Sequence, residues 1–345
     1  MSVFPEKFES ENELDRFITE PSAELVESCK SWEGDTVILG IGGKMGFHLG
    51  MMLVKALKRS GNSAGVIGVS RFSNPESRKK IEDAGIRTVA ADLMDEGAVA
   101  ALPDARRVVY MVGRKFGTSG SEELTWAVNT LIPPAVCRRY AGVPIVVYST
   151  GAVYDRVPVD SGGAVESSTL TPQGEYANAA VGRERIFQYC SGETGTPVCL
   201  IRLFYSIDLR YGVLRDIGEK VYSGKELNLD MGYVNVIWQG DAVNQSLLAF
   251  SRCSIPPRSL NITGPEIIPV RQTAERFGEL FGRKPKFSGF PAPDALLGNT
   301  EEAVRLFGTP KVSVDQMIIW TAEWLKDGGR GLGKPTHFET RNGSY

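Results

Sequence analysis

Residues 35–50, with the sequence DTVILGIGGKMGFHLG, decide the fold. They begin with a short apolar run, TVIL, that is rich in β-branched residues and stops at Gly40, as a buried strand does before a tight turn. From Met45 to Leu57 the apolar residues recur at helical spacing, and a second apolar run follows at 64–69. This order predicts a strand, a glycine turn, a helix and a parallel strand, which together form a βαβ unit.

Gly40, Gly43 and Gly46 occupy the junction between the strand and the helix. Missing side chains there let the backbone turn sharply, approach a pyrophosphate group and pack the helix against the strand. The helix N-terminus adds free N–H groups and the positive end of the helix dipole. We therefore predict a dinucleotide-binding loop, with a glycine turn that serves only packing as the alternative.

The composition is that of a globular protein. The chain has 345 residues, a net charge of −2 and a pI near 5.9. Without an excess of basic residues to neutralise phosphates, a nucleic-acid partner is not expected. The first residues are acidic, and no apolar run has the length of a signal-peptide core or a membrane span. We expect no membrane partner and a cytoplasmic protein with one large or two closely joined domains.

Cysteine and histidine are sparse. The five cysteines are scattered and never form a C-x-x-C pair, and the chain has only two histidines. Disulfides and a zinc site are therefore not expected, and we predict no metal centre. His48 falls on the helix after the glycine loop, where a packed or solvated residue is favoured over a catalytic one.

Strands and helices continue to alternate up to about residue 150, which predicts an α/β fold with a doubly wound parallel sheet. The ligand of such a sheet binds beyond the carboxyl ends of its strands. The predicted strands are 37–39, 66–69, 88–91, 108–112 and 145–148, and the predicted helices are 45–59, 76–84, 96–101 and 122–140.

The end of the second predicted strand distinguishes two cofactors. NAD sites usually place an acidic residue there for the ribose hydroxyls, but this chain has Ser70, Arg71 and Ser73 around Phe72. An arginine with two hydroxyls suits a 2′-phosphate better than a diol. The sequence therefore favours NADP over NAD, with a solvated loop arginine as the alternative for Arg71.

These residues resemble those of a known family, the extended short-chain dehydrogenases/reductases of the epimerase/dehydratase group. LGIGGKMG at 39–46 is similar to the family's T-G-x-x-G-x-x-G loop, with leucine in place of threonine. VVYSTGAVY at 146–154 is similar to its S-S/T-x-x-V-Y segment and puts Thr150 at the active-site hydroxyl. Further landmarks follow in order over roughly residues 36–290: Asp92-Leu93, Asn129, Tyr176, Glu184, Arg202, NVIWQGDAV at 235–243 and LNITG at 260–264.

The resemblance implies a Rossmann fold, an NAD(P) cofactor and hydride transfer with a sugar, nucleotide sugar or similar polyol. Thr150 would bond the substrate oxygen, and Tyr176 would handle its proton. Many members form homodimers through the helices that match 122–140 and 176–189, which raises the expectation of a homodimer. Contacts to the cofactor are expected from Gly40, Gly43, Lys44, Met45, Gly46, Ser70, Arg71, Asp92, Leu93 and Val112.

The chain departs from the family at the Y-x-x-x-K signature, because Ala180 stands where the lysine should be. In the family that lysine holds the nicotinamide ribose and lowers the pKa of the tyrosine. Another positive charge is then required, since a tyrosine of ordinary pKa, about 10, is rarely ionised at neutral pH. Arg183 lies seven positions after Tyr176 on nearly the same helical face and reaches back over Ala180. We predict that Arg183 supplies the charge; an ordinary ion pair with a surface carboxylate is the alternative.

The chain divides into four parts. The predicted order is an N-terminal extension at 1–33 on the outside of the main domain, an NAD(P)-binding Rossmann domain at 34–203 with a returning segment at 233–263, a smaller C-terminal α/β substrate lobe from 204–232 and 264–327, and a loosely attached tail at 328–345. Helices are expected in the lobe at 270–281, 300–307 and 314–325.

Two functions fit these observations. One is an epimerase, dehydratase or reductase that acts on a small carbohydrate. The other is a non-catalytic module that binds a dinucleotide as a redox sensor or scaffold. Ala180 favours the module, whereas Thr150, Tyr176 and a complete lobe favour the enzyme.

Overall fold

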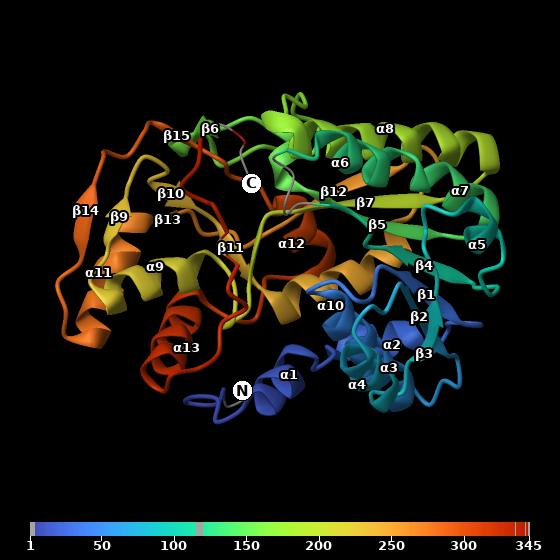
Figure 1. Cartoon of the computed structure of the whole chain (residues 1–345), viewed down its shortest axis with the longest axis horizontal. Helices are drawn as coiled ribbons and strands as arrows, with labels where there is room; N and C mark the ends of the chain where they lie inside the picture. Colours follow the sequence, from blue (N-terminus) through green and yellow to red (C-terminus); the bar gives the residue numbers. More distant parts are fainter. Residues whose placement is uncertain (1–3, 115–119, 335, 342, 344–345) are drawn as a thin grey trace.

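The computed structural model of the chain describes residues 4–114, 120–334, 336–341 and 343. Parts of the predicted extension, 1–3, and of the predicted tail, 335, 342 and 344–345, therefore lie outside the described residues. Figure 1 shows a sheet domain covered by helices on both faces, with a smaller lobe beside it.

The sheet domain is built on a parallel sheet of seven strands in the order β12-β7-β5-β4-β1-β2-β3. Val37 in β1, an inner strand, pairs with Ile67 of β2 on one side and Val108 of β4 on the other. This order confirms the predicted doubly wound α/β fold. The strands are β1 (Thr36–Leu39), β2 (Val66–Ser70), β3 (Arg87–Ala90), β4 (Arg107–Tyr110), β5 (Ile145–Thr150), β7 (Val198–Leu203) and β12 (Arg258–Ile262).

Successive side chains of each strand enter different cores because they point to opposite faces of the sheet. Val37 and Leu39 belong to one apolar core, and Ile38 belongs to another. The first core is covered by α5 (Glu96–Ala100), α7 (Ile132–Arg139) and α8 (Gly174–Thr194), and the second by α2 (Ala23–Cys29), α3 (Gly46–Ser60), α4 (Pro75–Asp83) and α10 (Gln239–Leu248).

The helix predicted at 122–140 is two helices, so this prediction was wrong. α6 (Glu122–Thr130) ends at Leu131, and α7 begins at Ile132. Pro133 and Pro134 follow directly, and a proline lacks the N–H that would bond the preceding turn. The chain therefore starts a new helix at this point, although α6 and α7 both pack on α8.

The lobe surrounds one large core that contains Trp238, Phe277 and Trp320. The predicted helix at 270–281 is observed with these bounds, and the other two predicted lobe helices also form. The helices of the lobe are α9 (Val213–Ser223), α11 (Val270–Phe281), α12 (Glu301–Phe307) and α13 (Val314–Lys326). Its short strand pairs are β8 (Tyr205–Ile207) with β11 (Val236–Trp238), β9 (Glu226–Asn228) with β14 (Lys286–Ser288), β10 (Tyr233–Val234) with β13 (Ile268–Pro269), and β6 (Val157–Pro158) with β15 (Asp294–Ala295). Short 3-10 turns occupy η1 (Gly151–Val153), η2 (Val159–Ser161) and η3 (Ala249–Arg252).

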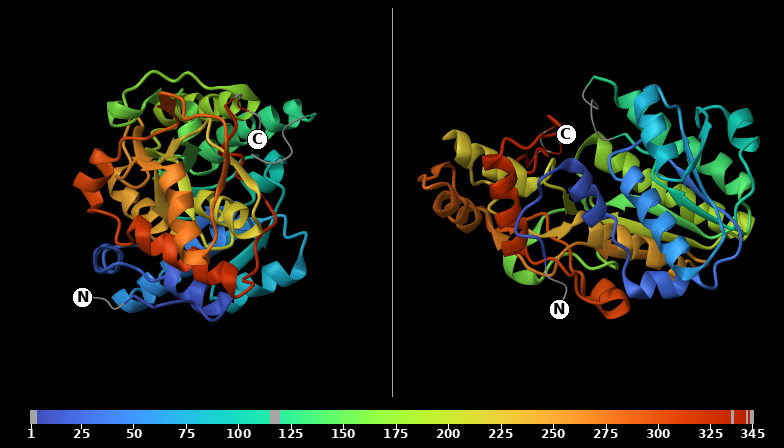
Figure 2. Two further views of the ribbon diagram at one scale, coloured as in Figure 1. Left: turned by 90° about the vertical axis from the view of Figure 1, so that its left-hand side faces the viewer. Right: turned by 90° about the horizontal axis from the view of Figure 1, so that it is seen from below.

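The N-terminal extension is part of the core rather than an outer layer, which corrects the prediction. In α1 (Glu11–Ile18), Leu14 and Ile18 are fully buried in the lobe core. The ring of Phe17 lies 5.2 Å from that of Trp320. α2 packs instead on α3 of the sheet domain. Figure 2, in its view from below, shows this blue segment between the two parts, so it joins them.

The described residues of the predicted tail are packed on the lobe, so for them the prediction of a loose attachment was wrong. Thr336 donates a hydrogen bond of 2.6 Å from its hydroxyl to Asp216 in α9. Phe338 is buried in the lobe core. A single aromatic anchor of this kind has no periodicity in the sequence, which is why the glycine-rich segment resembled a free tail.

Candidate functional site

The glycine loop forms the turn that the sequence predicts. Gly40 has a φ of +88°, a left-handed conformation that a side chain would strain. A Cβ atom on Gly40 would also lie 3.1 Å from the backbone of Met111 in the neighbouring chain segment. At Gly46 a Cβ atom would clash with the Ile41 carbonyl group, so this glycine lets α3 pack against the turn. Gly43 is the freest of the three, because a Cβ atom there would meet only the Gly40 oxygen, at 3.2 Å.

A cavity of about 690 Å³ lies beyond the carboxyl ends of β1, β2, β3 and β4. It gathers most of the residues predicted to contact a cofactor, from four separate strand ends. They are Gly40, Gly43, Ser70, Arg71, Asp92, Leu93 and Val112. A site of this volume suits an organic ligand of the size of a nucleotide, which typically needs about 300–1,000 Å³.

Three of the predicted cofactor residues do not line this cavity. Gly46 and Met45 lie at the start of α3, where the Met45 side chain packs against two apolar cores. The ammonium group of Lys44 lies over the ring of Tyr211 in the lobe, 3.2 Å from its centroid. Lys44 therefore links the glycine loop to the lobe.

Arg71 is exposed at the edge of the cavity. Within the described residues it makes no ion pair or hydrogen bond with another side chain. The next residue, Phe72, has a φ of +49°, and Ser70, Ser73 and Ser77 line the same edge of the cavity. One guanidinium and three hydroxyl groups thus surround a space open to a ligand.

Arg183 is buried below the end of β4. Its Nη1 donates hydrogen bonds of 3.1 Å to the Val112 oxygen and 2.7 Å to Asn129 Oδ1. A Cβ atom on Gly113, which lines the cavity, would lie 2.5 Å from the same Nη1. Its Nε is buried without a hydrogen-bond partner, and no carboxylate among the described residues pairs with the guanidinium. Arg183 is thus a buried cation beside the cavity, and the surface ion pair considered as the alternative is not formed.

Thr150 ends β5, and its hydroxyl accepts a hydrogen bond of 3.2 Å from the Ala152 N–H. Tyr176 lies in the first turn of α8 and is partly buried. Four residues later, Ala180 is fully buried in a small apolar cluster with Val153 and Tyr154. The position of the family's lysine is therefore closed by apolar side chains in this chain.

A buried network behind Thr150 was not predicted as a unit, although each of its members lies within a segment or position noted as a family landmark. Glu184 accepts a hydrogen bond of 2.7 Å from Arg202 Nη2 and one of 2.5 Å from the Ser149 hydroxyl. Arg202 also donates to the Tyr154 hydroxyl, which donates in turn to Asn261 Oδ1. Burial raises the pKa of Tyr154 to about 12 against the opposing charge of Arg202, so its hydroxyl stays protonated.

A second buried network connects the N-terminal extension to the sheet domain and to the lobe. Asp15 Oδ1 lies 2.7 Å from His48 Nε2 and accepts a hydrogen bond of 2.8 Å from Arg210. His48 also meets Gln239 at 2.5 Å, which agrees with the prediction of a packed residue. Burial alone would raise the pKa of Asp15, but the hydrogen bond from His48 and the charge of Arg210 outweigh it and hold that pKa below its usual value. Sequence reasoning missed Asp15, because its partners are remote in the chain.

Two features are not found in the described part of the chain: a cluster of metal ligands and a membrane-spanning helix. No three His, Cys, Asp or Glu side chains come together there in a way that would hold a metal ion. None of its helices combines the length and apolar character needed to cross a membrane.

Solved structures share this fold. The chain matches MoeE5 in complex with UDP-glucuronic acid and NAD at 19% identity and a TM-score of 0.69, over 86% of this chain and 100% of that one. It matches UDP-glucuronic acid 4-epimerase from Bacillus cereus in complex with NAD at 16% identity and a TM-score of 0.69, over 85% and 99% of the two chains. UDP-glucose 4-epimerase from Thermotoga maritima with UDP-glucose gives 18% identity and a TM-score of 0.68, again over 85% and 99%. This chain thus carries segments that those structures lack.

A comparison with curated proteins found no match. The model of the NAD dependent epimerase/dehydratase family matches residues 37–207, from β1 to the end of β8. These residues include the glycine loop, the cavity and the positions of Thr150, Tyr176 and Arg183. The resemblance expected from the motifs is therefore confirmed for residues 37–207, which match the NAD dependent epimerase/dehydratase family.

Proposed function

We propose that the protein binds a nicotinamide dinucleotide in the 690 Å³ cavity and uses it to oxidise or reduce a hydroxyl-bearing carbon of a small carbohydrate, as an epimerase, dehydratase or reductase. The observation that carries this proposal is the gathering of the glycine loop, Arg71 and Asp92 around one cavity. The similar structures are complexes with NAD or with UDP-sugars, which agrees with the proposal.

The residues of the cavity fit such a cofactor. Gly40 and Gly43 leave bare backbone where a pyrophosphate would lie, before the N-terminus of α3. Asp92 would contact the adenine. Arg71, which has no partner in the described part of the chain, would pair with a 2′-phosphate, so NADP is the preferred cofactor and NAD the alternative.

The chemistry needs a proton donor and acceptor beside the reacting carbon. When bound, a nicotinamide dinucleotide accepts or returns a hydride at C4 of its nicotinamide. The Thr150 hydroxyl would donate a hydrogen bond to the substrate oxygen. Tyr176 would take the hydroxyl proton during oxidation and return it during reduction.

We assign to Arg183 the positive charge that the lysine of the Y-x-x-x-K signature supplies in the family. A buried cation without a carboxylate partner costs several kcal/mol unless an anion compensates it. We propose that its guanidinium, at the end of β4, stabilises negative charge on the Tyr176 phenol or bonds a ribose hydroxyl when the cofactor is bound. It would not relay protons, because arginine stays protonated.

A non-catalytic dinucleotide-binding module is the second candidate. It is favoured by one observation, the apolar cluster that encloses Ala180. Reduction of NADP by any sugar or polyol, followed at the nicotinamide absorbance, would exclude this module.

A titration of the folded protein with NADPH and NADH, followed by nicotinamide fluorescence, tests the proposal. Saturable binding with a preference for NADPH is expected. Absence of binding of both cofactors would contradict the enzyme and the module together.

We also propose that α6 and α8 form a homodimer interface. They carry exposed apolar side chains, with Leu124 on α6, Leu131 at its end and Tyr189 on α8. Because scattered apolar residues are common on protein surfaces, the oligomeric state has to be measured directly. Sedimentation equilibrium should show a dimer, and Leu131→Glu should convert it to a monomer.

A further inference from the structure

The residues that line the 690 Å³ cavity, as far as the structure describes them, all belong to the sheet domain. They fall between Gly40 and Ile132, before the first element of the lobe. The lobe nevertheless touches the glycine loop at the edge of this cavity, because the Lys44 ammonium lies 3.2 Å from the centroid of the Tyr211 ring. Tyr211 is therefore a residue of the lobe that can influence cofactor binding from outside the cavity.

Two exposed residues in the middle of the glycine loop, Gly42 and Gly43, have no side chains to anchor them. Glycine also adopts several backbone conformations at low cost. Lys44 follows directly and is partly buried, so it is the first side chain after them that can anchor this part of the loop. Its contact with the lobe therefore fixes the segment that would face the pyrophosphate.

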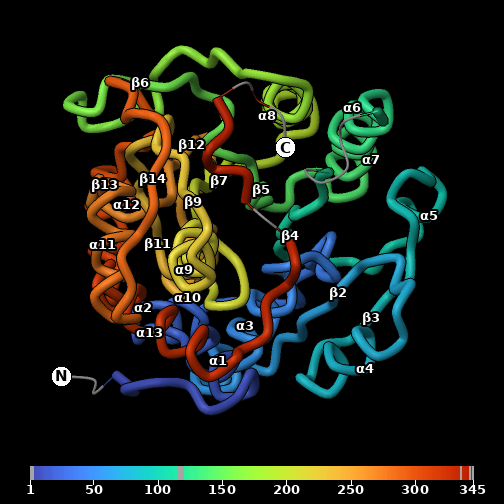
Figure 3. The backbone as a smooth tube through the Cα atoms, turned by 60° about the vertical axis from the view of Figure 1, so that its left-hand side comes forward, coloured from blue at the N-terminus to red at the C-terminus, as the bar shows by residue number. Residues whose placement is uncertain are grey.

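Tyr211 is a firm support because its turn is fixed at several points. Two backbone hydrogen bonds of 2.8 and 3.0 Å between Asp208 and Tyr211 close the turn. Within it, the Arg210 guanidinium bonds the Asp208 and Asp15 carboxylates, both at 2.8 Å. Arg210 also lies 3.3 Å from His48 Nε2 in the first turn of α3. Figure 3 shows this turn in yellow, just before α9 and close to blue α3, so the lobe contacts both the glycine loop and the helix after it.

The contact between Lys44 and Tyr211 is a cation–π interaction and not an ion pair. Burial raises the pKa of Tyr211, and the nearby Asp216 and Tyr176 raise it further through their charges. The phenol therefore stays neutral, and the ammonium of Lys44 lies over the negative face of an aromatic ring. The influence of Tyr176 also shows that this turn is close to the start of α8, which carries the proposed proton donor.

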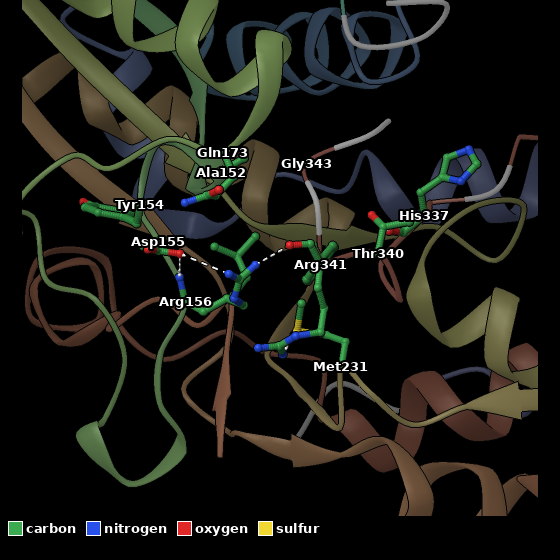
Figure 4. A pocket seen from close by; sticks show the side chains of 12 residues that line it. Ala152, Tyr154, Asp155, Arg156, Gln173, Met231, His337, Thr340, Arg341 and Gly343 are labelled. Atoms are coloured by element: carbon green, nitrogen blue, oxygen red, sulfur yellow. Dashed lines mark hydrogen bonds and ion pairs between the residues drawn. The ribbon is translucent and has the colours of Figure 1, made fainter. Parts of the chain in front are cut away.

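The pocket in Figure 4 offers no alternative position for the cofactor. Ala152, Arg156 and Met231 are among its lining residues, and its volume is about 30 Å³. That volume holds about two water molecules, far less than the roughly 300–1,000 Å³ of sites for organic ligands. The dinucleotide is therefore assigned to the 690 Å³ cavity, and its binding reports on the state of the glycine loop.

We infer that Tyr211 is a positioning residue of the cofactor site. Its ring holds the Lys44 side chain, and through it the glycine loop, in the shape that receives the pyrophosphate. The lobe thus strengthens dinucleotide binding without lining the cavity, and by thermodynamic reciprocity a bound dinucleotide holds the lobe turn in place. This inference rests on the proposed function for the position of the cofactor, and it adds a residue outside the segment 37–207 that matches the family model.

The test is a fluorescence titration of matched proteins with NADPH and NADH. Tyr211→Phe keeps the ring, Tyr211→Leu removes it, and trifluorophenylalanine at position 211 keeps its shape but withdraws electron density from its face. Lys44→Met, alone and combined with Tyr211→Leu, completes a double-mutant cycle. The controls are Tyr222→Leu, at an exposed tyrosine of the same lobe, and Lys58→Met, at an exposed lysine of α3. Melting curves show which variants are folded.

We expect Tyr211→Phe and both controls to bind the dinucleotide as the wild type does. Tyr211→Leu and the trifluorinated variant should bind it at least about threefold more weakly, and the double variant no more weakly than Lys44→Met alone. Wild-type affinity of folded Tyr211→Leu, an equal loss in Tyr211→Phe, or independent effects of the two substitutions would each overturn the inference. If Tyr211→Leu does not fold, the trifluorinated variant decides. A failure of the proposed function shows separately, because the wild type itself would then bind neither dinucleotide.

Discussion

The guanidinium of Arg202 and the carboxylate of Glu184 form an ion pair of 2.7 Å in which both side chains are almost fully buried. Arg202 lies on β7, and Glu184 lies on α8, two turns after Tyr176. Glu184 also accepts from Ser149, the neighbour of Thr150. The pair therefore fixes the strand end that carries Thr150 relative to the helix that carries Tyr176.

Glu184→Gln should destabilise the protein strongly. Removal of one partner leaves the Arg202 charge buried without compensation, which costs about 3–5 kcal/mol. Urea unfolding at neutral pH measures this loss. Glu193→Gln, at an exposed position of the same helix, should change the free energy of unfolding little. Equal stabilities of the two variants would contradict the structural role of the pair.

Gly43→Val should abolish dinucleotide binding and leave the protein folded. This glycine has an ordinary φ and one close neighbour, so a side chain fits the backbone but enters the cavity. Cofactor titration and circular dichroism check the two parts of the prediction. Gly192→Val, at a position of α8 with open space around it, should bind as the wild type does. Retained binding by a folded Gly43→Val protein would refute the loop assignment.

Arg71→Ala should remove most of the preference for NADPH over NADH. A charge-assisted hydrogen bond contributes about 1.5–3 kcal/mol, so NADPH affinity should fall about 10- to 150-fold while NADH affinity stays nearly constant. Nicotinamide fluorescence gives both dissociation constants. Lys79→Ala, an exposed position on the nearby α4, is the charge-matched control. A wild type that binds both cofactors equally would rule out the phosphate contact.

Arg183→Met should weaken cofactor binding and lower any turnover, because it removes the buried charge beside Gly113 while nearly conserving volume. We expect a loss of about tenfold or more in NADPH affinity. Arg185→Met, two residues along α8 and exposed, should have no such effect. If both variants bind and turn over alike, Arg183 only supports Val112 and Asn129.

Asp15→Asn should lower the free energy of unfolding at pH 7 but not at acidic pH. The folded protein holds the pKa of Asp15 below its unfolded value, so the unfolded chain binds the proton more readily. The resulting stability is fully present above about pH 4, near the unfolded pKa, and is lost as the pH falls toward the folded pKa. Urea unfolding of both proteins between pH 7 and pH 3.5 should show their difference shrinking. A difference independent of pH would show that the carboxylate charge is not involved.

Local patterns explain why the sheet could be predicted. Each part of the first βαβ unit has a local signal: an apolar run at 36–39, glycines in the turn, and helical spacing that includes Leu49 and Leu53. The later strands show the same kind of short apolar run. Where two signals overlapped, the prediction failed, as at 122–140, where apolar spacing continued through Pro133 and Pro134 while the helix did not.

The sequence by itself determined the doubly wound fold and the glycine turn, and it is the source of the predictions for Arg71, Thr150 and Tyr176, because each depends on residues close together in the chain. Only the tertiary structure decided what Arg183 and Arg341 contact. Arg183 meets Val112, 71 positions away, and Arg341 meets Asp294, 47 positions away. Such contacts leave no local pattern, since a charged side chain that bonds a remote partner has the same sequence surroundings as one in solvent.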